Sequence, residues 1–470
     1  MAQSIKLSEI KQWCAGEWNQ KPNERASVTQ LSTDTRSLQP GDLFVAIRGE
    51  SFDGHEYLKQ AVEKGAAAAL VERDVDLSIP TLKVSDSLKA LVKIGISLRD
   101  QFQGTAIAIT GSAGKSSTKE MLATLLGPST VKSPASYNNL LGLSKTLWLL
   151  EKNTKNLVME MGMNAVGEIA ELCAAFRPEY GCITNIGDAH VGKVGSIEKV
   201  FKAKKEMWDY LAGHVPSTKG IALNIDDLKV VEAFETTIAK KQIPVLKYSL
   251  KNSNADIFIA DHRVHPNRGT LELTLSIQGK PYQQSLPIFG LHHAQNIAAA
   301  VALARLVGVS SEDIVSRLPL LGAAKHRGEI YDLGQARLLI DESYNSNPSA
   351  LDSSLTTLAQ LDTSRRRLLV LGEMRELGEF SQELHAQLGR RLVALSDANA
   401  FPFIVIGVGE GMTHLVAEIK KSKPNIPWFF VQSAKEALSH VRLLLKPSDI
   451  IYVKGSRAIA LEQIVESLTK

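Results

Sequence analysis

The 470-residue sequence is poor in cysteine and contains no long apolar run. Its three cysteines, Cys14, Cys173 and Cys182, are too few and too irregularly spaced for a disulfide framework or a zinc site, and they fit a reducing compartment. No run of about 18 apolar residues is present, so we expect no membrane span. The first residues lack the apolar core of a signal peptide, and we therefore expect a cytoplasmic protein.

An excess of one charge is also absent. The chain has 54 Lys and Arg residues against 50 Asp and Glu residues, which leaves a formal net charge of +4. Broad nucleic-acid binding requires a clustered basic face, so this near balance argues against a helicase or another P-loop motor. A small anionic substrate would need only a local positive pocket.

Strand-like apolar runs alternate with helix-length segments along almost the whole chain, which predicts an α/β protein with mainly parallel sheets. We expect three domains: a small N-terminal α/β domain over residues 1–101, a central P-loop domain with a parallel sheet over 102–318, and a C-terminal Rossmann-like domain over 319–470. The last has the pattern of a doubly wound sheet, with strand candidates at 338–341, 367–371, 403–406, 428–431 and 450–453.

The strongest local motif is a glycine loop between a predicted strand and a predicted helix. We expect seven of its residues to bind a nucleotide: Gly111, Ser112, Ala113, Gly114, Lys115, Ser116 and Ser117. Such a loop turns backbone N–H groups towards phosphate oxygens, Lys115 would reach the terminal phosphates, and Ser116 or Ser117 would hold Mg²⁺. Ile109 replaces the first glycine of the full pattern. The alternative, a plain strand–helix turn with a solvated lysine, fits this context poorly.

Two neighbouring strand ends carry candidate metal ligands. The predicted strand at 156–159 stops at Glu160, and the one at 181–186 is followed by His190. Because ligands bind outside the carboxyl ends of parallel strands, Lys115, Glu160 and His190 are expected to converge. Glu160 offers the oxygen donor that Mg²⁺ prefers. Taken alone, Glu160 would equally be a loop carboxylate, and His190 would be a packed or surface histidine.

A helical stretch downstream carries Lys202, Lys204 and Lys205 beside an apolar stripe. Taken alone, this pattern indicates a solvated helix face. Their spacing by itself assigns them no chemistry.

The order of these motifs resembles the Mur ligase family along nearly the whole chain. The segments that carry the resemblance are G-x-x-G-K-S-S at 111–117, M-E-M-G at 159–162, T-N-I-x-x-x-H at 184–190, A-K-x-E-M-W at 203–208, G-L-H-H-A-Q-N at 290–296, Arg327, D-E-S-Y-N-S-N-P at 341–348, L-G-E-M-R-E-L-G at 371–378 and V-K-G-S-R at 453–457. The runs at 343–348, 372–378 and 454–457 are most similar to the member that joins D-alanyl-D-alanine to a UDP-muramoyl-tripeptide. The D-N-P-R run expected of a diaminopimelate-adding sister is absent.

The resemblance implies an ATP- and Mg²⁺-dependent ligase that phosphorylates the terminal carboxylate of the tripeptide, so that an amine can attack the acyl phosphate. It implies catalytic roles for Lys115, Glu160, His190 and a carbamylated Lys204, with Ser116, Glu160, His190 and Lys204 around the metal. It implies nucleotide contacts from Asn296, Arg327 and Glu342. It implies substrate contacts from Asp34, Arg36, Asn138, Asn139, Tyr344, Asn345 and Asn347, the first two within a UDP-sugar-binding N-terminal domain.

The resemblance further implies a monomer whose partners are small molecules and whose third domain closes onto the second. Four positions depart from the family pattern: His293 replaces asparagine, Glu342 replaces aspartate, Ser144 replaces proline and His326 replaces glycine. Three alternatives stay open, namely the ligase that adds the third residue, a folylpolyglutamate synthase, and a nucleotide-binding regulator without catalysis. The third residue of the tripeptide, lysine or diaminopimelate, also stays open.

Overall fold

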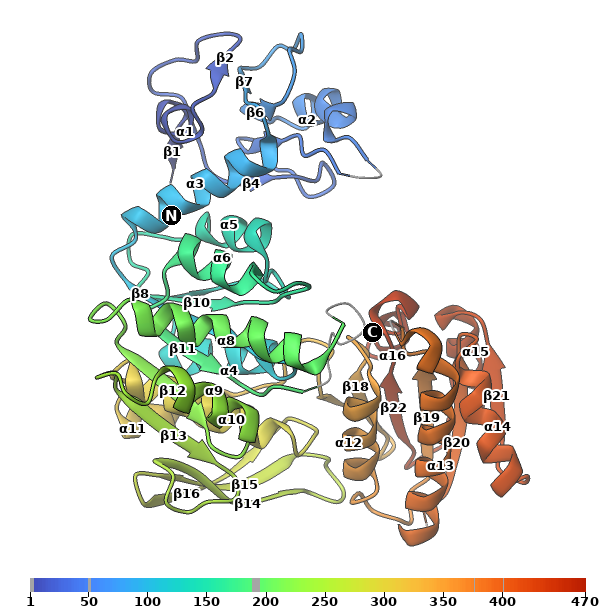
Figure 1. Cartoon of the computed structure of the whole chain (residues 1–470). Coiled ribbons are helices and arrows are strands. Elements are labelled where there is room, and N and C mark those ends of the chain that lie inside the picture. The colour runs from blue at the N-terminus through green and yellow to red at the C-terminus, as the bar shows by residue number, and fades with distance from the viewer. Residues whose placement is uncertain (1–3, 50–51, 188–194, 376, 400) are drawn as a thin grey trace. The chain divides into compact units, whose positions relative to one another are not determined.

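The structure, a computed structural model, describes residues 4–49, 52–187, 195–375, 377–399 and 401–470. Its contacts divide the chain into two compact units, each described by itself below. Unit 1 comprises Met1–Thr110, Leu126–Gly181 and Ala203–Lys219, and unit 2 comprises Gly111–Leu125, Cys182–Lys202 and Gly220–Lys470. The described strands form sheets of two, five, nine and six strands, and helices connect them (Figure 1), which confirms the predicted α/β class.

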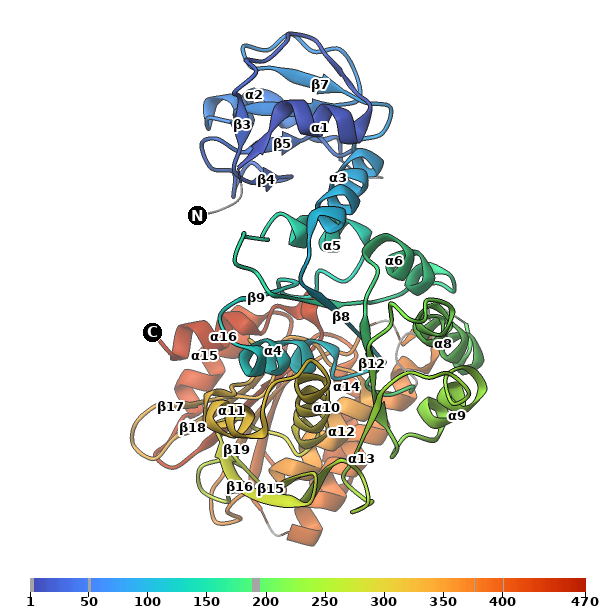
Figure 2. The ribbon, with the colours of Figure 1, turned by 90° about the vertical axis from the view of Figure 1, so that its left-hand side faces the viewer.

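The N-terminal part of unit 1 contains β1 (Ile5–Lys6), α1 (Leu7–Cys14), β2 (Glu17–Trp18), β3 (Ser27–Val28), β4 (Leu31–Ser32), β5 (Leu43–Val45), η1 (Gly54–Tyr57), α2 (Leu58–Glu63), β6 (Ala68–Val71), β7 (Thr81–Lys83) and α3 (Ser87–Gln101). Its five-stranded sheet has the order β2-β7-β6-β5-β4 and is parallel except for the β2–β7 pair. Phe44 and Ala69 of the sheet pack with Leu58 and Ala61 of α2. Figure 2 shows α2 together with β5 and β7 in this part of the chain.

The nine-stranded sheet has the order β16-β15-β14-β13-β12-β11-β8-β10-β9. The middle of the chain contains β8 (Thr105–Thr110), α4 (Lys115–Leu126), β9 (Thr130–Lys132), α5 (Leu140–Leu147), β10 (Asn156–Glu160), α6 (Glu168–Phe176), β11 (Tyr180–Ile183), α8 (Ile197–Gly213), β12 (Gly220–Asn224), α9 (Leu228–Thr237), β13 (Val245–Ser249), β14 (Ile257–Val264), β15 (Leu271–Ile277), β16 (Lys280–Leu286), α10 (His293–Leu306), α11 (Ser311–Arg317) and η2 (Leu318–Leu320). Within unit 2, α10 packs against β12, β13 and β14.

This sheet is mixed rather than wholly parallel. β10 pairs in parallel with β8 and β9, and β13 pairs in parallel with β12 and β14, whereas β14, β15 and β16 form an antiparallel meander. The meander was not predicted from the sequence. Along β15 buried residues alternate with half-exposed ones, as expected for an antiparallel strand that is covered on one face only.

The C-terminal part of unit 2 contains β17 (Glu329–Asp332), β18 (Leu338–Glu342), α12 (Pro348–Leu358), β19 (Arg367–Gly372), η3 (Gly378–Phe380), α13 (Ser381–Asn399), β20 (Phe403–Val408), α14 (Met412–Ser422), β21 (Trp428–Val431), α15 (Ala434–Leu444), β22 (Ile450–Lys454), η4 (Arg457–Ile459) and α16 (Glu462–Leu468). All five predicted strands are present. The sheet order is β17-β18-β22-β19-β20-β21, with only β17 antiparallel.

Successive residues of these strands face opposite sides of the C-terminal sheet. Leu369 and Leu371 pack with α12, α13 and α14, whereas Leu368 and Val370 pack with α15 and α16. This double cover confirms the Rossmann-like arrangement. Among the described residues, no helix combines the length and the apolar character that crossing a lipid bilayer requires.

Candidate active site

Two glycines shape the loop between β8 and α4. Gly111 has a φ of +148° and Gly114 a φ of +81°, values that residues with a side chain rarely adopt. Space is limiting as well, because a Cβ on Gly111 would lie 1.9 Å from Thr184 Oγ1 and a Cβ on Gly114 would lie 2.2 Å from Asn296 Oδ1. Both positions therefore require glycine.

The segment that follows β11 holds the loop in shape. Ala113 N–H donates a hydrogen bond to Asn185 Oδ1 at 2.8 Å, and Thr184 Oγ1 donates one to the Ala113 carbonyl at 2.6 Å. Ser112 Oγ donates to the Gly187 carbonyl at 3.0 Å and accepts from the Gly187 N–H at 2.9 Å. Asn185 belongs to the T-N-I run but was not among the predicted site residues, and its side chain supports the loop.

Lys115 begins α4, and its Nζ donates to the Gly111 carbonyl at 2.7 Å. Its charge therefore lies directly against the glycine loop. Ser116 and Ser117 follow in the first turn of the helix and are 7% and 4% exposed. A helix N-terminus that carries a lysine and two hydroxyl groups suits a phosphate group with its Mg²⁺.

On the other side of the loop, α10 supplies Asn296 and His293. Asn296 Nδ2 lies 3.4 Å from His293 Nδ1, and His293 Nε2 lies 3.0 Å from the Arg327 carbonyl oxygen. Because a carbonyl only accepts, Nε2 carries the proton of this histidine. Burial lowers the pKa of His293 well below its usual value, so the ring is neutral. Where the family usually has asparagine, this histidine joins α10 to the loop that carries Arg327.

In unit 1, Glu160 ends β10 with only 2% of its surface exposed. Its Oε1 accepts a hydrogen bond from Asn138 Nδ2 at 3.1 Å, and its N–H donates to Ser133 Oγ at 3.1 Å. Asn139 caps α5 instead, since its Oδ1 accepts from the Gly142 N–H at 2.9 Å. Asn138 thus positions the carboxylate, whereas Asn139 has a structural role that the resemblance did not indicate.

Lys204 in α8 is 1% exposed, whereas Lys202 is exposed. Val200 and Trp208 lie four residues on either side of Lys204, on the same helix face, and are fully buried. The interpretation of this stretch as a solvated face is therefore wrong for Lys204. A buried ammonium group is costly unless a partner or a chemical modification neutralises it, so the position is compatible with the carbamate that the resemblance implies.

In the N-terminal part of unit 1, Arg36 and Asp34 form an ion pair on one loop, with an Nη2–Oδ2 distance of 2.7 Å and 89% of the arginine side chain exposed. Hydrogen bonds from Arg36 lower the pKa of Asp34 to about 2. Lys145 of α5 donates from Nζ to Thr33 Oγ1 at 2.5 Å. Two cationic side chains therefore lie at this loop, as an anionic diphosphate would require.

At the carboxyl edge of the C-terminal sheet, two arginines share one aromatic ring. Arg327 Cζ lies 4.0 Å and Arg457 Cζ 5.4 Å from the centroid of the Tyr344 ring. Asn347 caps α12 by accepting a backbone N–H of its first turn at 2.8 Å, whereas Asn345 is exposed. Of these two predicted substrate contacts, Asn345 has the more accessible side chain.

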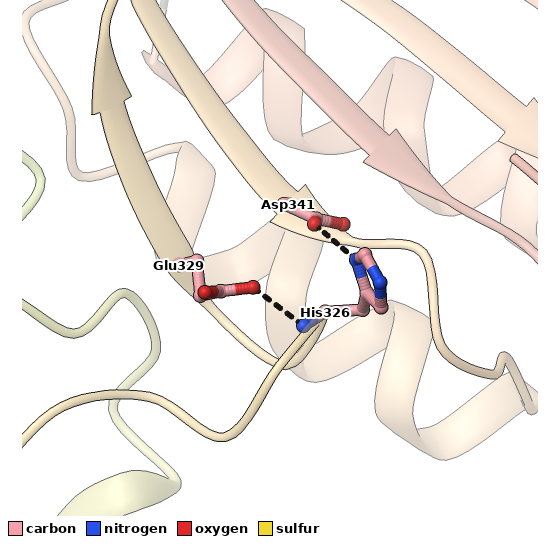
Figure 3. Close-up of side chains that lie close together, drawn as sticks. All are labelled: His326, Glu329 and Asp341. Atoms are coloured by element: carbon pink, nitrogen blue, oxygen red, sulfur yellow. Dashed lines mark hydrogen bonds and ion pairs between the residues drawn. The ribbon is translucent and has the colours of Figure 1, made fainter. Parts of the chain in front are cut away.

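His326, Glu329 and Asp341 form a cluster whose possible metal-ligand atoms lie within 4.8 Å of one another (Figure 3). The backbone N–H of His326 donates to Glu329 Oε2 at 2.6 Å, and the ring Nδ1 of His326 donates to Asp341 Oδ2 at 2.7 Å. Asp341 Oδ1 accepts from the N–H and the hydroxyl of Ser343. His326 has a φ of +63°, which explains why glycine is common at this position. The cluster therefore braces the loop that precedes Arg327.

Glu342 ends β18 with 4% exposure. Its Oε2 accepts hydrogen bonds from Ser354 Oγ at 2.5 Å and from the Tyr452 hydroxyl, and Lys454 Nζ lies 3.5 Å away. Burial alone would raise the pKa of Glu342, but Lys454, His292 and the two hydroxyl groups together lower it to about 2. The charged carboxylate is thus enclosed by side chains of its own sheet and helices, and its implied contact with the nucleotide stays a prediction.

The structure brings part of the predicted set together. In unit 2, α10 and the segment after β11 surround the phosphate loop, and in unit 1 Asn138 contacts Glu160. Lys115 belongs to unit 2, whereas Glu160 and Lys204 belong to unit 1, so their convergence stays a prediction. His190 lies outside the described residues.

Family models match most of the chain. Residues 27–124 match the model described as Mur ligase family, catalytic domain. Residues 109–304 match the Mur ligase middle domain, and residues 326–457 match the Mur ligase, glutamate ligase domain.

Full-length relatives agree with these matches. The UDP-N-acetylmuramoyl-tripeptide--D-alanyl-D-alanine ligase of Synechocystis sp. is 32% identical over 455 residues, which are 95% of this chain and 93% of the relative. The structure of MurF from Acinetobacter baumannii has a TM-score of 0.86 at 30% identity, with 100% and 99% of the two chains covered. MurF from Thermotoga maritima, solved in complex with ADP, has a TM-score of 0.77 at 25% identity, with 94% and 97% covered. This chain belongs to the Mur ligase family of ATP-dependent amide ligases.

Proposed function

We propose that this protein joins D-alanyl-D-alanine to UDP-N-acetylmuramoyl-tripeptide and so makes the pentapeptide precursor of peptidoglycan. The observation that carries the proposal is the full-length likeness to a ligase named for this reaction, at 32% identity over 95% of the chain. The S-Y-N-S-N-P run at 343–348 supports the same amine. The three cysteines are buried free thiols, which supports the cytoplasm as the proposed compartment.

The reaction would proceed in two steps. The terminal carboxylate of the tripeptide attacks the γ-phosphorus of ATP, so that ADP leaves and an acyl phosphate forms. The dipeptide amine then attacks the acyl carbon, loses a proton and expels phosphate as the amide bond forms. The backbone N–H groups of the glycine loop and the Lys115 ammonium would hold the phosphates, and Arg327 would stabilise their charge from the C-terminal side.

The oxygen donors of this chain fit a Mg²⁺ ion, because Glu160 is a buried carboxylate and Ser116 lies in the first turn of α4. We propose that Ser116, Glu160, His190 and a carbamylated Lys204 hold the metal. When bound, Mg²⁺ neutralises charge on the transferring phosphoryl group. Asn138 would keep the Glu160 carboxylate in place through its hydrogen bond of 3.1 Å.

The remaining assignments follow the proposed domains. Residues 1–101 would bind the UDP-sugar, with Asp34 and Arg36 beside the diphosphate. Residues 102–318 would bind ATP, with Asn296 contacting the nucleotide and Asn138 and Asn139 near the muramoyl peptide. Glu342, from the 319–470 domain, would contact the same nucleotide. Residues 319–470 would bind the dipeptide, with Tyr344, Asn345 and Asn347 nearest to it.

A phosphate-release assay with matched substrate sets separates the candidate functions. We expect release only when ATP, UDP-N-acetylmuramoyl-tripeptide and D-alanyl-D-alanine are all present. Release with the UDP-muramoyl-dipeptide and a single amino acid would favour the ligase that adds the third residue. Release with a folate and glutamate would favour a folylpolyglutamate synthase. ATP binding without phosphate release in any set would favour a regulator.

A further inference from the structure

A cavity of about 820 Å³ lies in unit 2 at the amino ends of β18, β19 and β22. Its wall includes Leu338 at the start of β18, the loops that precede β19 and β22, and the turn between β14 and β15. Glu342, a proposed nucleotide contact, ends β18 at the opposite, carboxyl edge of the same sheet. The length of β18 separates the two edges by about 13 Å. The cavity is therefore distinct from the site described above.

The cavity wall carries more cationic side chains than carboxylates. Arg268 and Lys446 are exposed, and across the described ranges no hydrogen bond or ion pair involves their side-chain nitrogens. Arg337 also lines the wall, and its Nη2 donates to a neutral partner, Gln335 Oε1. Three cations thus face the cavity without a paired carboxylate.

Each acidic residue of the wall already has a hydrogen-bond or ion-pair partner close to it in the structure. Asp362 Oδ1 accepts from the N–H and the hydroxyl of Ser364, and Asp332 Oδ1 accepts from the Gly334 N–H. Asp449 pairs with Arg366 at 2.6 Å. The wall carries five cationic side chains against these three carboxylates, so a net positive charge remains for a ligand.

Two donors in the same wall lack a partner. Thr270 Oγ1 and Arg337 Nε are buried and have no hydrogen bond within the part of the chain that the structure describes. Leaving a buried donor unsatisfied costs free energy. Both atoms are shielded from solvent, so they belong to the interior of the wall and not to the surface that a ligand would meet.

A further arginine holds the walls of the cavity together. Arg365 donates to the carbonyls of Asn267, Ala336 and Ser448 at 2.9, 2.6 and 2.9 Å. Asn267 lies in the β14–β15 turn, whereas the other two carbonyls belong to loops of the C-terminal sheet. Hydrogen bonds from Arg365 to backbone carbonyls thus hold the walls of the cavity in place.

We propose that this cavity binds a small anion that carries a phosphate or diphosphate group. Arg268, Arg337 and Lys446 meet the anionic oxygens. Guanidinium groups suit phosphate because their parallel N–H groups match two of its oxygens. The cavity volume lies in the range of small-molecule sites. A bound anion would contact both the β14–β15 turn and the C-terminal sheet.

The test is calorimetric titration of the full chain with inorganic pyrophosphate in a Lys115→Ala background, which removes the lysine of the phosphate loop. The test variant adds Arg268→Ser and Lys446→Ser, both at exposed positions. The matched control adds Lys421→Ser and Lys435→Ser, two exposed lysines outside the cavity wall. We expect the test variant to bind one pyrophosphate fewer, or to bind it at least tenfold more weakly, than the control.

Equal stoichiometry and affinity in the two variants would overturn the proposal, as would the absence of pyrophosphate binding in the Lys115→Ala parent. Circular dichroism spectra that match the parent would show that both variants fold. The titration involves no turnover, so its outcome is independent of the proposed ligase reaction.

Discussion

The phosphate loop and the carboxyl edge of the C-terminal sheet differ in what their motif residues do in the folded structure. In the loop, Gly111 and Gly114 shape the backbone, and Asn185 of another segment supports it by accepting two of its N–H groups. At the C-terminal edge, Glu342 and Asn347 are already occupied by their own strands and helices. Burial and hydrogen-bond partners therefore distinguish motif residues that brace the fold from those, such as Asn345, whose side chains stay exposed.

The largest effect should come from the loop. Lys115→Ala should lower kcat for phosphate release by about 10²–10³-fold, because a positioned cation at the transferring phosphoryl group is lost. The midpoint of urea unfolding should stay unchanged, since this side chain is only partly buried. Exposed Lys421→Ala serves as the control. A kcat within twofold of the wild type would remove Lys115 from the catalytic set.

The next largest effect should come from Glu342, which braces the C-terminal sheet. Glu342→Gln should lower the free energy of unfolding by about 3–5 kcal/mol, because the buried Lys454 ammonium loses its charged partner. Chemical unfolding measures this, and Glu466→Gln on the exposed side of α16 is the control. A variant with wild-type stability but weaker ATP binding would show instead that Glu342 acts as a ligand contact.

Asn345 and Asn347 of the 343–348 run allow an exposed side chain to be compared with a helix cap within one motif. Asn347→Ala should cost about 1 kcal/mol of stability through the loss of a helix cap. Asn345→Ala should leave stability unchanged and raise KM for the dipeptide, because its side chain is exposed. Thermal unfolding and steady-state kinetics on both variants decide the matter. The reverse assignment of the two effects would contradict this use of the motif.

The smallest effect should be a change in pH dependence. The pKa of His293 in the folded state lies below its ordinary value of 6.5. As the pH falls below 6.5, the unfolded chain therefore binds the proton first, and the folded state loses stability. His293→Asn should therefore flatten the fall in Tm between about pH 7 and pH 5. Exposed His214→Asn should keep the wild-type slope. An unchanged slope in His293→Asn would exclude this histidine as the cause.

The sequence predicts the phosphate loop and the strand before it better than the elements around them. Thr105–Thr110 forms the expected strand, because its apolar run is local information. The burial of Lys204 was missed, although its spacing from Val200 and Trp208 places all three on one helix face. The meander around β15 was missed although Leu271–Ile277 alternates regularly.

Other features were beyond sequence reasoning. The contact between His293 and Arg327 joins residues 34 positions apart, and it depends on how α10 packs beside the C-terminal sheet. The caps at Asn139 and Asn347 likewise occupy side chains that the resemblance assigns to substrates. The sequence therefore identifies residue types for the chemistry, whereas the tertiary structure decides which of them stay accessible.

The most direct test of the proposed reaction counts phosphate and identifies the product in one mixture. ATP, UDP-N-acetylmuramoyl-tripeptide and D-alanyl-D-alanine are incubated with the wild type and with Lys115→Ala, and the products are analysed by mass spectrometry. We predict one phosphate for each UDP-N-acetylmuramoyl-pentapeptide formed by the wild type, and no phosphate when the dipeptide is omitted. Phosphate release that is indifferent to the dipeptide, or release without the pentapeptide, would contradict the proposal.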